Sequence, residues 1–211
     1  MTRVKHNKPE RQLAITQLIS KIKESRGIMP LSAAYLLMLP AMFILPLFSV
    51  PEYSIIRNTL SELGAQSAPG AWIMNIIFTA LALGSVIAGW RFFDGFVFHR
   101  IILILFGVSL ALMAFFNHAP VNPEVQYNLR EDGWHAYFAG TAVLSFIILS
   151  IATSFILEKQ QDRQLARAAG TSAMVLMVLM AEADRLAGVW QRLILIISFG
   201  WMIYCFKASE S

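Results

Sequence analysis

The chain has 211 residues, of which 57% are hydrophobic and only 14% are charged, with a net charge of +4. A typical soluble domain has about 45–50% apolar and about 25% charged residues, so this composition excludes a soluble enzyme of standard type. Because one bilayer-spanning helix uses about 20 residues, the chain has room for roughly six spans, and we expect an all-α, polytopic membrane protein with a six-helix transmembrane bundle.

The chain begins with a basic, polar segment at residues 1–29. Leucines and isoleucines recur there at helix-like spacing among Lys, Arg and Gln. The segment is either an amphipathic helix lying on an anionic membrane surface or a solvated basic tail. The apolar run that follows, at about residues 30–50, is longer than the core of a signal peptide and lacks a convincing cleavage site, so it is interpreted as a retained first span.

Five further spans are predicted at about residues 71–90, 101–117, 134–157, 168–186 and 189–206, followed by a short tail at 208–211. The last two spans come from one long apolar segment that charged residues and Gly188 divide into a tight helical hairpin. Small residues recur at every fourth position in two spans, where they are expected to let neighbouring helices approach closely. These residues are Ala80, Gly84 and Ala88 in the second span and Ala136 and Gly140 in the fourth.

The basic residues predict the orientation, because short cytoplasmic loops of membrane proteins hold an excess of Lys and Arg. With the N-terminus inside, 13 of the 17 Lys and Arg residues fall on the inner side. Both termini are therefore predicted to be cytoplasmic, and the net positive charge requires no nucleic-acid partner. The compact loops and the absence of Asn-x-Ser/Thr sequons favour a bacterial inner membrane.

Polar residues gather in the loops on the predicted outer side. The charge-free parts of the last two spans, residues 168–181 and 193–206, are each shorter than a full crossing, so flanking charged residues must lie near the interface. Charges there normally face a bundle interior or a cavity, although a collar of mutually neutralised charges, including a Glu182–Arg185 pair, is the alternative. The ligand-binding candidates are Asn58, Ser61, Glu62, His135, Glu182, Asp184, Arg185, Gln191 and Arg192.

The first outer loop carries a helix-start signal. Thr59-x-x-Glu62 fits a capping box and Gly64 is suited to end the same turn, so a one-turn interfacial helix is predicted. The alternative is that this turn directs Ser61 and Glu62 toward the bundle axis.

The second outer loop contains Asn122-Pro123-Glu124, which predicts a short helix before Gly133. Asp132 and His135 would share a helix face only if the fourth helix begins by Asp132.

Four motifs together resemble the DUF998 family over most of the segment from Pro30 to Phe206. The resemblance implies a six-helix membrane protein with these motifs on one side, and it implies no assigned activity. The motifs are Leu60-Ser61-Glu62-Leu63-Gly64-Ala65 after the first span, Phe116-Asn117-His118 at the end of the third, His135 at the start of the fourth, and Gly188-x-Trp190-Gln191-Arg192 at the start of the last.

Two functions are compatible with these residues. In the first, an outward-facing polar pocket at the membrane interface binds a lipid headgroup or a small solute. Arg185 or Arg192 would pair with an anionic ligand, and Glu62 and His135 would fix it.

The second function is that of a metal-assisted hydrolase or transferase acting on a lipidic substrate at the outer face. Histidine and carboxylate side chains are typical ligands of zinc and other divalent metals, and a metal-bound water could attack an ester or amide. The candidate ligands are His118, His135, Glu62 and Asp132. No catalytic residue and no oligomeric state is predicted.

Overall fold

A computed structural model describes residues 27–208 and confirms the all-α, six-span architecture. No strand occurs within this range, and six of its helices are long and apolar enough to cross a membrane. They are the first span (Gly27–Phe48), α3 (Ala71–Phe92), α4 (Val97–Phe115), α5 (Leu129–Thr153), α6 (Gln160–Glu182) and α7 (Ala187–Ala208). The predicted basic segment 1–29 and the tail 208–211 lie almost wholly outside the described residues.

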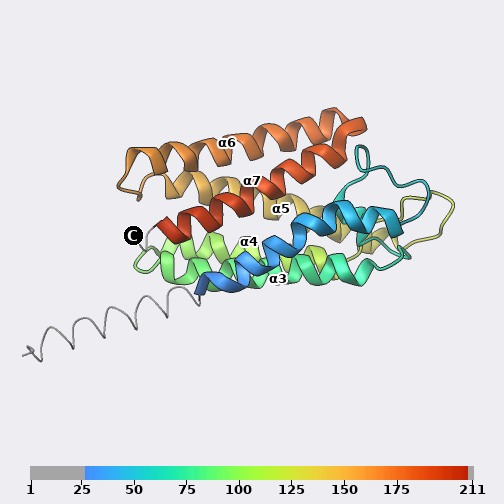
Figure 1. Cartoon of the computed structure of the whole chain (residues 1–211), viewed down its shortest axis with the longest axis horizontal. Coiled ribbons are helices and arrows are strands. Elements are labelled where there is room, and N and C mark those ends of the chain that lie inside the picture. Colours follow the sequence, from blue (N-terminus) through green and yellow to red (C-terminus); the bar gives the residue numbers. More distant parts are fainter. Residues whose placement is uncertain (1–26, 209–211) are drawn as a thin grey trace, which may run out of the picture.

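The connections between the helices define two ends of the bundle (Figure 1). Loops 49–70 and 116–128 lie at one end together with the turn between α6 and α7, and we call this the Ser61 end. Loops 93–96 and 154–159 lie at the other end, which we call the Asp94 end. The one-turn helix α2 (Leu60–Leu63) is part of the first loop, and the 3-10 turns η1 (Leu45–Phe48) and η2 (Asp184–Leu186) end the first span and join the last two helices.

Small residues bring the first span and α3 together. A Cβ added at Gly84 would lie only 2.7 Å from the Cα of Leu31, so the two backbones are in contact at this point. The close approach predicted for the stripe in the second span is confirmed. The corresponding prediction for Ala136 and Gly140 in α5 is wrong, because a Cβ on Gly140 would meet nothing within 4 Å.

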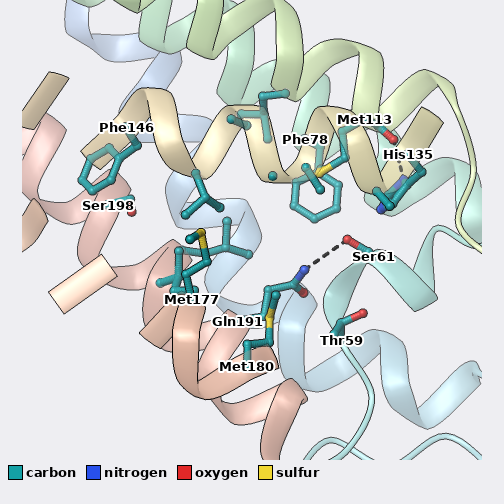
Figure 2. Close-up of a pocket in the computed structure, with 18 of the residues that line it drawn as sticks. Thr59, Ser61, Phe78, Met113, His135, Phe146, Met177, Met180, Gln191 and Ser198 are labelled. Carbon is teal, nitrogen blue, oxygen red and sulfur yellow. Dashed lines mark hydrogen bonds between the residues drawn. The ribbon is translucent and has the colours of Figure 1, made fainter. Parts of the chain in front are cut away.

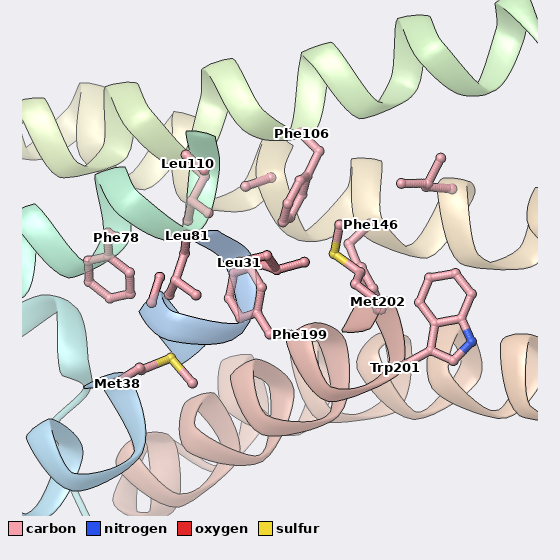
Figure 3. Packing of buried hydrophobic residues seen from close by; sticks show 14 of the residues in the cluster. Leu31, Met38, Phe78, Leu81, Phe106, Leu110, Phe146, Phe199, Trp201 and Met202 are labelled. Atoms are coloured by element: carbon pink, nitrogen blue, oxygen red, sulfur yellow. The ribbon is translucent and has the colours of Figure 1, made fainter. Parts of the chain in front are cut away.

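An aromatic cluster fills the middle of the bundle (Figure 3). Phe106 of α4 lies 6.3 Å from Phe146 of α5 and 6.1 Å from Phe199 of α7, measured between ring centroids. Phe146 and Phe199 are almost fully buried. These rings connect α7 to α4 and α5, and Trp201 of α7 adds a further contact with Phe146 (5.8 Å).

The second loop of the Ser61 end corrects one prediction. Residues 121–125 form turns, and the Asn122 side chain accepts a hydrogen bond from the backbone N–H of Glu124 (2.9 Å) without starting a helix. The helix begins at Leu129 instead, where the Asn128 side chain caps the N–H groups of Arg130 and Glu131. Because α5 starts before Asp132, this residue and His135 lie on the same helix, one turn apart.

Candidate functional site

A cavity of about 300 Å³ extends from the Ser61 end toward the middle of the bundle. Apolar side chains and small residues of α3 to α7 form most of its wall, and the aromatic cluster lies at its inner end. Its lining has no aspartate, glutamate, lysine or arginine. The polar members of the lining are Thr59, Ser61, His118, His135, Gln191 and Ser198.

The cavity exists because α5 and α6 separate toward the Ser61 end. At the Asp94 end the two helices are in contact, since a Cβ on Gly170 would lie 2.9 Å from Ile151 and the Ser150 hydroxyl donates to the Ala166 carbonyl. Toward the Ser61 end the helices diverge (Figure 1), and the small residue Gly140 of α5 leaves space beside Met177 of α6. The residues predicted to form a packing stripe therefore form a wall of the pocket.

His135 is the most unusual polar group in the pocket, with only 4% of its surface exposed. Its Nδ1 lies 2.9 Å from the carbonyl oxygen of Met113 and 2.8 Å from that of Phe116. Because carbonyl oxygens only accept hydrogen bonds, Nδ1 carries the proton, and Nε2 of the neutral ring is an acceptor. Nε2 is buried and has no hydrogen-bond partner among the described residues.

The predicted one-turn helix at Thr59 is confirmed as α2, including its capping box. The Thr59 side chain accepts from the backbone N–H of Glu62, and the Glu62 carboxylate accepts from the backbone N–H and the hydroxyl of Thr59. Asn58 donates a further hydrogen bond to the other carboxylate oxygen (2.8 Å). The carboxylate of Glu62 is therefore held within its own loop and does not line the pocket.

Ser61 points the other way, into the pocket (Figure 2). It is 3% exposed, and the side-chain amide of Gln191 donates a hydrogen bond to its Oγ (3.1 Å). The carbonyl oxygen of the same amide accepts from the backbone N–H of Leu60 (2.6 Å). Gln191 is thus fixed at both ends, and the hydroxyl hydrogen of Ser61 donates to no acceptor within residues 27–208.

Arg192 is buried, with 4% of its surface exposed, but it bonds to loop 49–70 and does not line the pocket. Its Nη1 donates to the carbonyls of Ile55 (2.8 Å), Asn58 (3.0 Å) and Gly188 (2.8 Å). Nε and Nη2 donate to the carbonyl of Met42, and Nη2 also donates to the Tyr53 hydroxyl (2.9 Å). Every N–H of the guanidinium is directed to an oxygen of this loop, α7 or the first span.

The Tyr53 hydroxyl completes this network by donating to the carbonyl of Thr59 (2.9 Å). Burial raises the pKa of Tyr53 above the usual tyrosine value, although the neighbouring Arg192 acts in the opposite direction. The phenol therefore remains a donor.

Gly188 allows the loop to reach α7. Its backbone N–H donates to the carbonyl of Arg57 (3.2 Å), and the N–H of Val189 donates to that of Ile56 (3.3 Å). The loop thereby satisfies two N–H groups that the start of a helix leaves unpaired.

The charged residues of the α6–α7 turn lie away from the pocket. Glu182, Asp184 and Arg185 are exposed, and no ion pair joins Glu182 to Arg185 in the part of the chain that the structure describes. Ser61, His135 and Gln191 are thus the ligand-binding candidates that the structure brings to the pocket. Asn58, Glu62 and Arg192 instead bond to loop 49–70, behind the pocket.

The metal-binding candidates are only partly brought together. His118 Nδ1 lies 3.5 Å from Asp132 Oδ1, and the rings of His118 and His135 are 4.9 Å apart. Asp132 also accepts from the backbone N–H of Ala119 (2.7 Å), while Glu62 is engaged in its capping box. Residues 27–208 contain no group of three or more His, Cys, Asp or Glu side chains that could hold a metal ion.

Sequence reasoning missed the apolar wall and Ser198. The Ser198 Oγ is buried without a hydrogen-bond partner among residues 27–208, and it lies at the far end of the pocket beside Phe146 (Figure 2). A serine inside an apolar span often bonds to its own helix, so its position gave no signal. The small residues of α5 did give a signal, which was interpreted as packing.

Comparison with known proteins gives one match. The family model described as "Protein of unknown function (DUF998)" matches residues 32–206. No curated protein and no solved structure matches the chain significantly.

Proposed function

The chain belongs to the DUF998 family of proteins of unknown function, and we propose that it binds a membrane lipid in the pocket at its Ser61 end. One observation carries this proposal: a cavity with mostly apolar walls ends at neutral polar groups, among which the Ser61 hydroxyl and Nε2 of His135 have unused hydrogen-bonding capacity. A volume of about 300 Å³ is at the lower limit of typical ligand pockets, and apolar walls with a few polar groups are their usual composition. An acyl chain would lie between α5, α6 and α7, with its polar group beside Ser61 and His135.

The wall between α5 and α6 supports entry from the membrane. Ala136 of α5 is exposed although it lines the cavity, and Met177 and Met180 on the opposite helix have flexible side chains. No membrane lipid would then need to cross the polar loops of the Ser61 end.

We also propose that the Ser61 end faces outward from a bacterial inner membrane, with both termini in the cytoplasm. The excess of Lys and Arg on the opposite side supports this orientation. Reporter fusions after Ser211 and within loop 116–128 test it. We expect green fluorescent protein fused after Ser211 to be fluorescent. Active alkaline phosphatase at the same position would show that the orientation is the opposite of the one proposed.

Lipid occupancy can be tested with two matched glycine variants of α5. Neither Gly133 nor Gly140 has an atom within 4 Å of an added Cβ, but only Gly140 lines the pocket. We expect lipid extracted from purified Gly140→Leu protein to fall several-fold below wild type by mass spectrometry, while Gly133→Leu protein retains it. Equal lipid content in the three proteins would refute the proposal.

A further inference from the structure

We propose that the lipid bound in this pocket carries an uncharged hydroxyl at its polar end and is thus a lipid alcohol. This inference rests on the proposed function and adds the chemical class of the ligand. It follows from the hydrogen-bonding capacity that the pocket leaves unused and from the position of the charged residues.

The acceptor at the polar end is Nε2 of His135. The carbonyl groups of Met113 and Phe116 hold the proton on Nδ1, so the ring cannot present an N–H to the pocket while it is neutral. A buried acceptor without a partner is unfavourable, and a ligand that donates a hydrogen bond to it would remove this cost. Esters, ketones and ethers lack such a donor.

The donor at the same end is the hydroxyl of Ser61. Gln191 occupies the acceptor side of Ser61 Oγ, so the remaining hydrogen is available to an incoming oxygen. Figure 2 shows Ser61 and His135 at the same end of the pocket, opposite Phe146 and Ser198. A ligand hydroxyl can donate to His135 and accept from Ser61, and thereby use both groups.

The charges argue against an ionic headgroup of either sign. The guanidinium of Arg192 is directed at carbonyl groups of the loop, and Arg185 is exposed, so no arginine is available for a carboxylate or phosphate. The second histidine of the lining, His118, already faces a carboxylate, since its Nδ1 lies 3.5 Å from Asp132 Oδ1. A bound anion would also oppose the lone pair of His135 Nε2. The carboxylate of Glu62 is held in its capping box, so an ammonium group would likewise have no counter-ion in the pocket.

Three probes with the same chain separate these possibilities: hexadecanol, hexadecanoate and hexadecyl methyl ether. Each competes, in lipid nanodiscs, with a hexadecanol that carries a photoactivatable diazirine in its chain, and crosslinking to the full-length protein is measured. We expect hexadecanol to compete about tenfold more strongly than the ether or the carboxylate, which corresponds to about 1.4 kcal/mol, because only the hydroxyl donates a hydrogen bond to Nε2 of His135. Equal competition by all three, or strongest competition by hexadecanoate, would overturn the assignment to alcohols.

The variant that isolates Nε2 is His135→Asn. The asparagine amide nitrogen takes the place of Nδ1 and can still donate to the carbonyls of Met113 and Phe116, but the acceptor at Nε2 is lost. We expect the advantage of hexadecanol over the ether to fall to about twofold or less, with competition by the ether unchanged. An undiminished preference for the alcohol in this variant would overturn the role of His135.

The controls separate this inference from the proposed function. Crosslinking that persists in Gly140→Leu at wild-type strength would place the lipid outside the pocket and refute the proposed function itself. Crosslinking that is lost in Gly140→Leu but shows no preference among the three probes would refute only the hydroxyl assignment. Gly133→Leu is expected to behave as wild type in both measurements.

Discussion

Replacing Gly188 by alanine tests whether loop 49–70 is held against the start of α7. A Cβ at Gly188 would lie 2.3 Å from the carbonyl oxygen of Asn58, 2.4 Å from that of Ile55 and 2.9 Å from Nη1 of Arg192. Real Cβ atoms do not come this close to a backbone oxygen, so Gly188→Ala must displace the loop. The displaced carbonyls are two of those that Arg192 binds.

The expected loss of stability follows from these contacts. Overpacking costs about 1–3 kcal/mol, and each hydrogen bond from a charged group contributes about 1.5–3 kcal/mol. If the loop relaxes so that the two Arg192 bonds lengthen without breaking fully, the free energy of unfolding should fall by about 3–5 kcal/mol. At about 2–4 °C per kcal/mol for a chain of this size, Tm should fall by roughly 10 °C.

The assay is thermal unfolding of the purified protein in detergent, followed by circular dichroism. Gly140→Ala is the matched control, because the added methyl group meets no atom within 4 Å and alanine favours a helix by about 1 kcal/mol over glycine. Gly140→Ala is expected to melt at or slightly above the wild-type temperature. If Gly188→Ala has the same Tm as Gly140→Ala, the loop is not held against Gly188 and the role assigned to Arg192 is wrong.

Three further predictions concern the support of the pocket. Glu62→Gln weakens the capping box and should lower the free energy of unfolding by about 1 kcal/mol, with lipid content unchanged because Glu62 lies outside the lining; a large loss of lipid would contradict this. The pKa of Tyr53 is raised in the fold, so the stabilisation from its protonated hydroxyl is present below the ordinary tyrosine pKa of about 10 and is lost as the pH rises above it. We therefore expect Tm to fall less steeply between neutral and alkaline pH in Tyr53→Phe than in wild type. Gly84→Ala should destabilise by about 1–3 kcal/mol in the same thermal assay, since the methyl group would meet the backbone of Leu31, and a wild-type Tm would disprove the close approach.

The architecture was predictable because hydropathy and charge act over whole segments. The runs of apolar residues located all six spans, although α5 and α6 begin earlier than those runs, at Leu129 and Gln160, where polar turns continue the helix. The capping box at Thr59 was predictable as well, because it depends on residues three positions apart in the chain. The turn at Asn122 shows the limit of such local signals, since an Asx turn and a helix N-cap use the same side-chain contact.

The pocket itself was not predictable, because it depends on how far apart two helices lie. The spacing of small residues predicts close helix packing at both Gly84 and Gly140, but only Gly84 lies against a neighbouring helix. The difference arises from the neighbouring helix: the first span is in contact with Gly84, whereas α6 is separated from Gly140 by the pocket. Charge was an equally incomplete guide, because Arg185 and Arg192 were equal candidates for an anionic ligand, whereas Arg185 is exposed and Arg192 is buried and bonded to backbone carbonyls.

A physical reason explains why the charged candidates hold the loop behind the pocket and neutral groups face the pocket. A charge away from water is tolerated only when it is fully hydrogen-bonded, and this requirement commits Arg192 to the carbonyls of the loop before any ligand is present. A neutral acceptor such as His135 Nε2 can remain unpaired at a cost of about 1–3 kcal/mol, which a marginally stable fold can sustain. In a pocket enclosed by apolar helices, the groups left free for a ligand are therefore expected to be neutral, and the charged residues nearby indicate how the site is held in place.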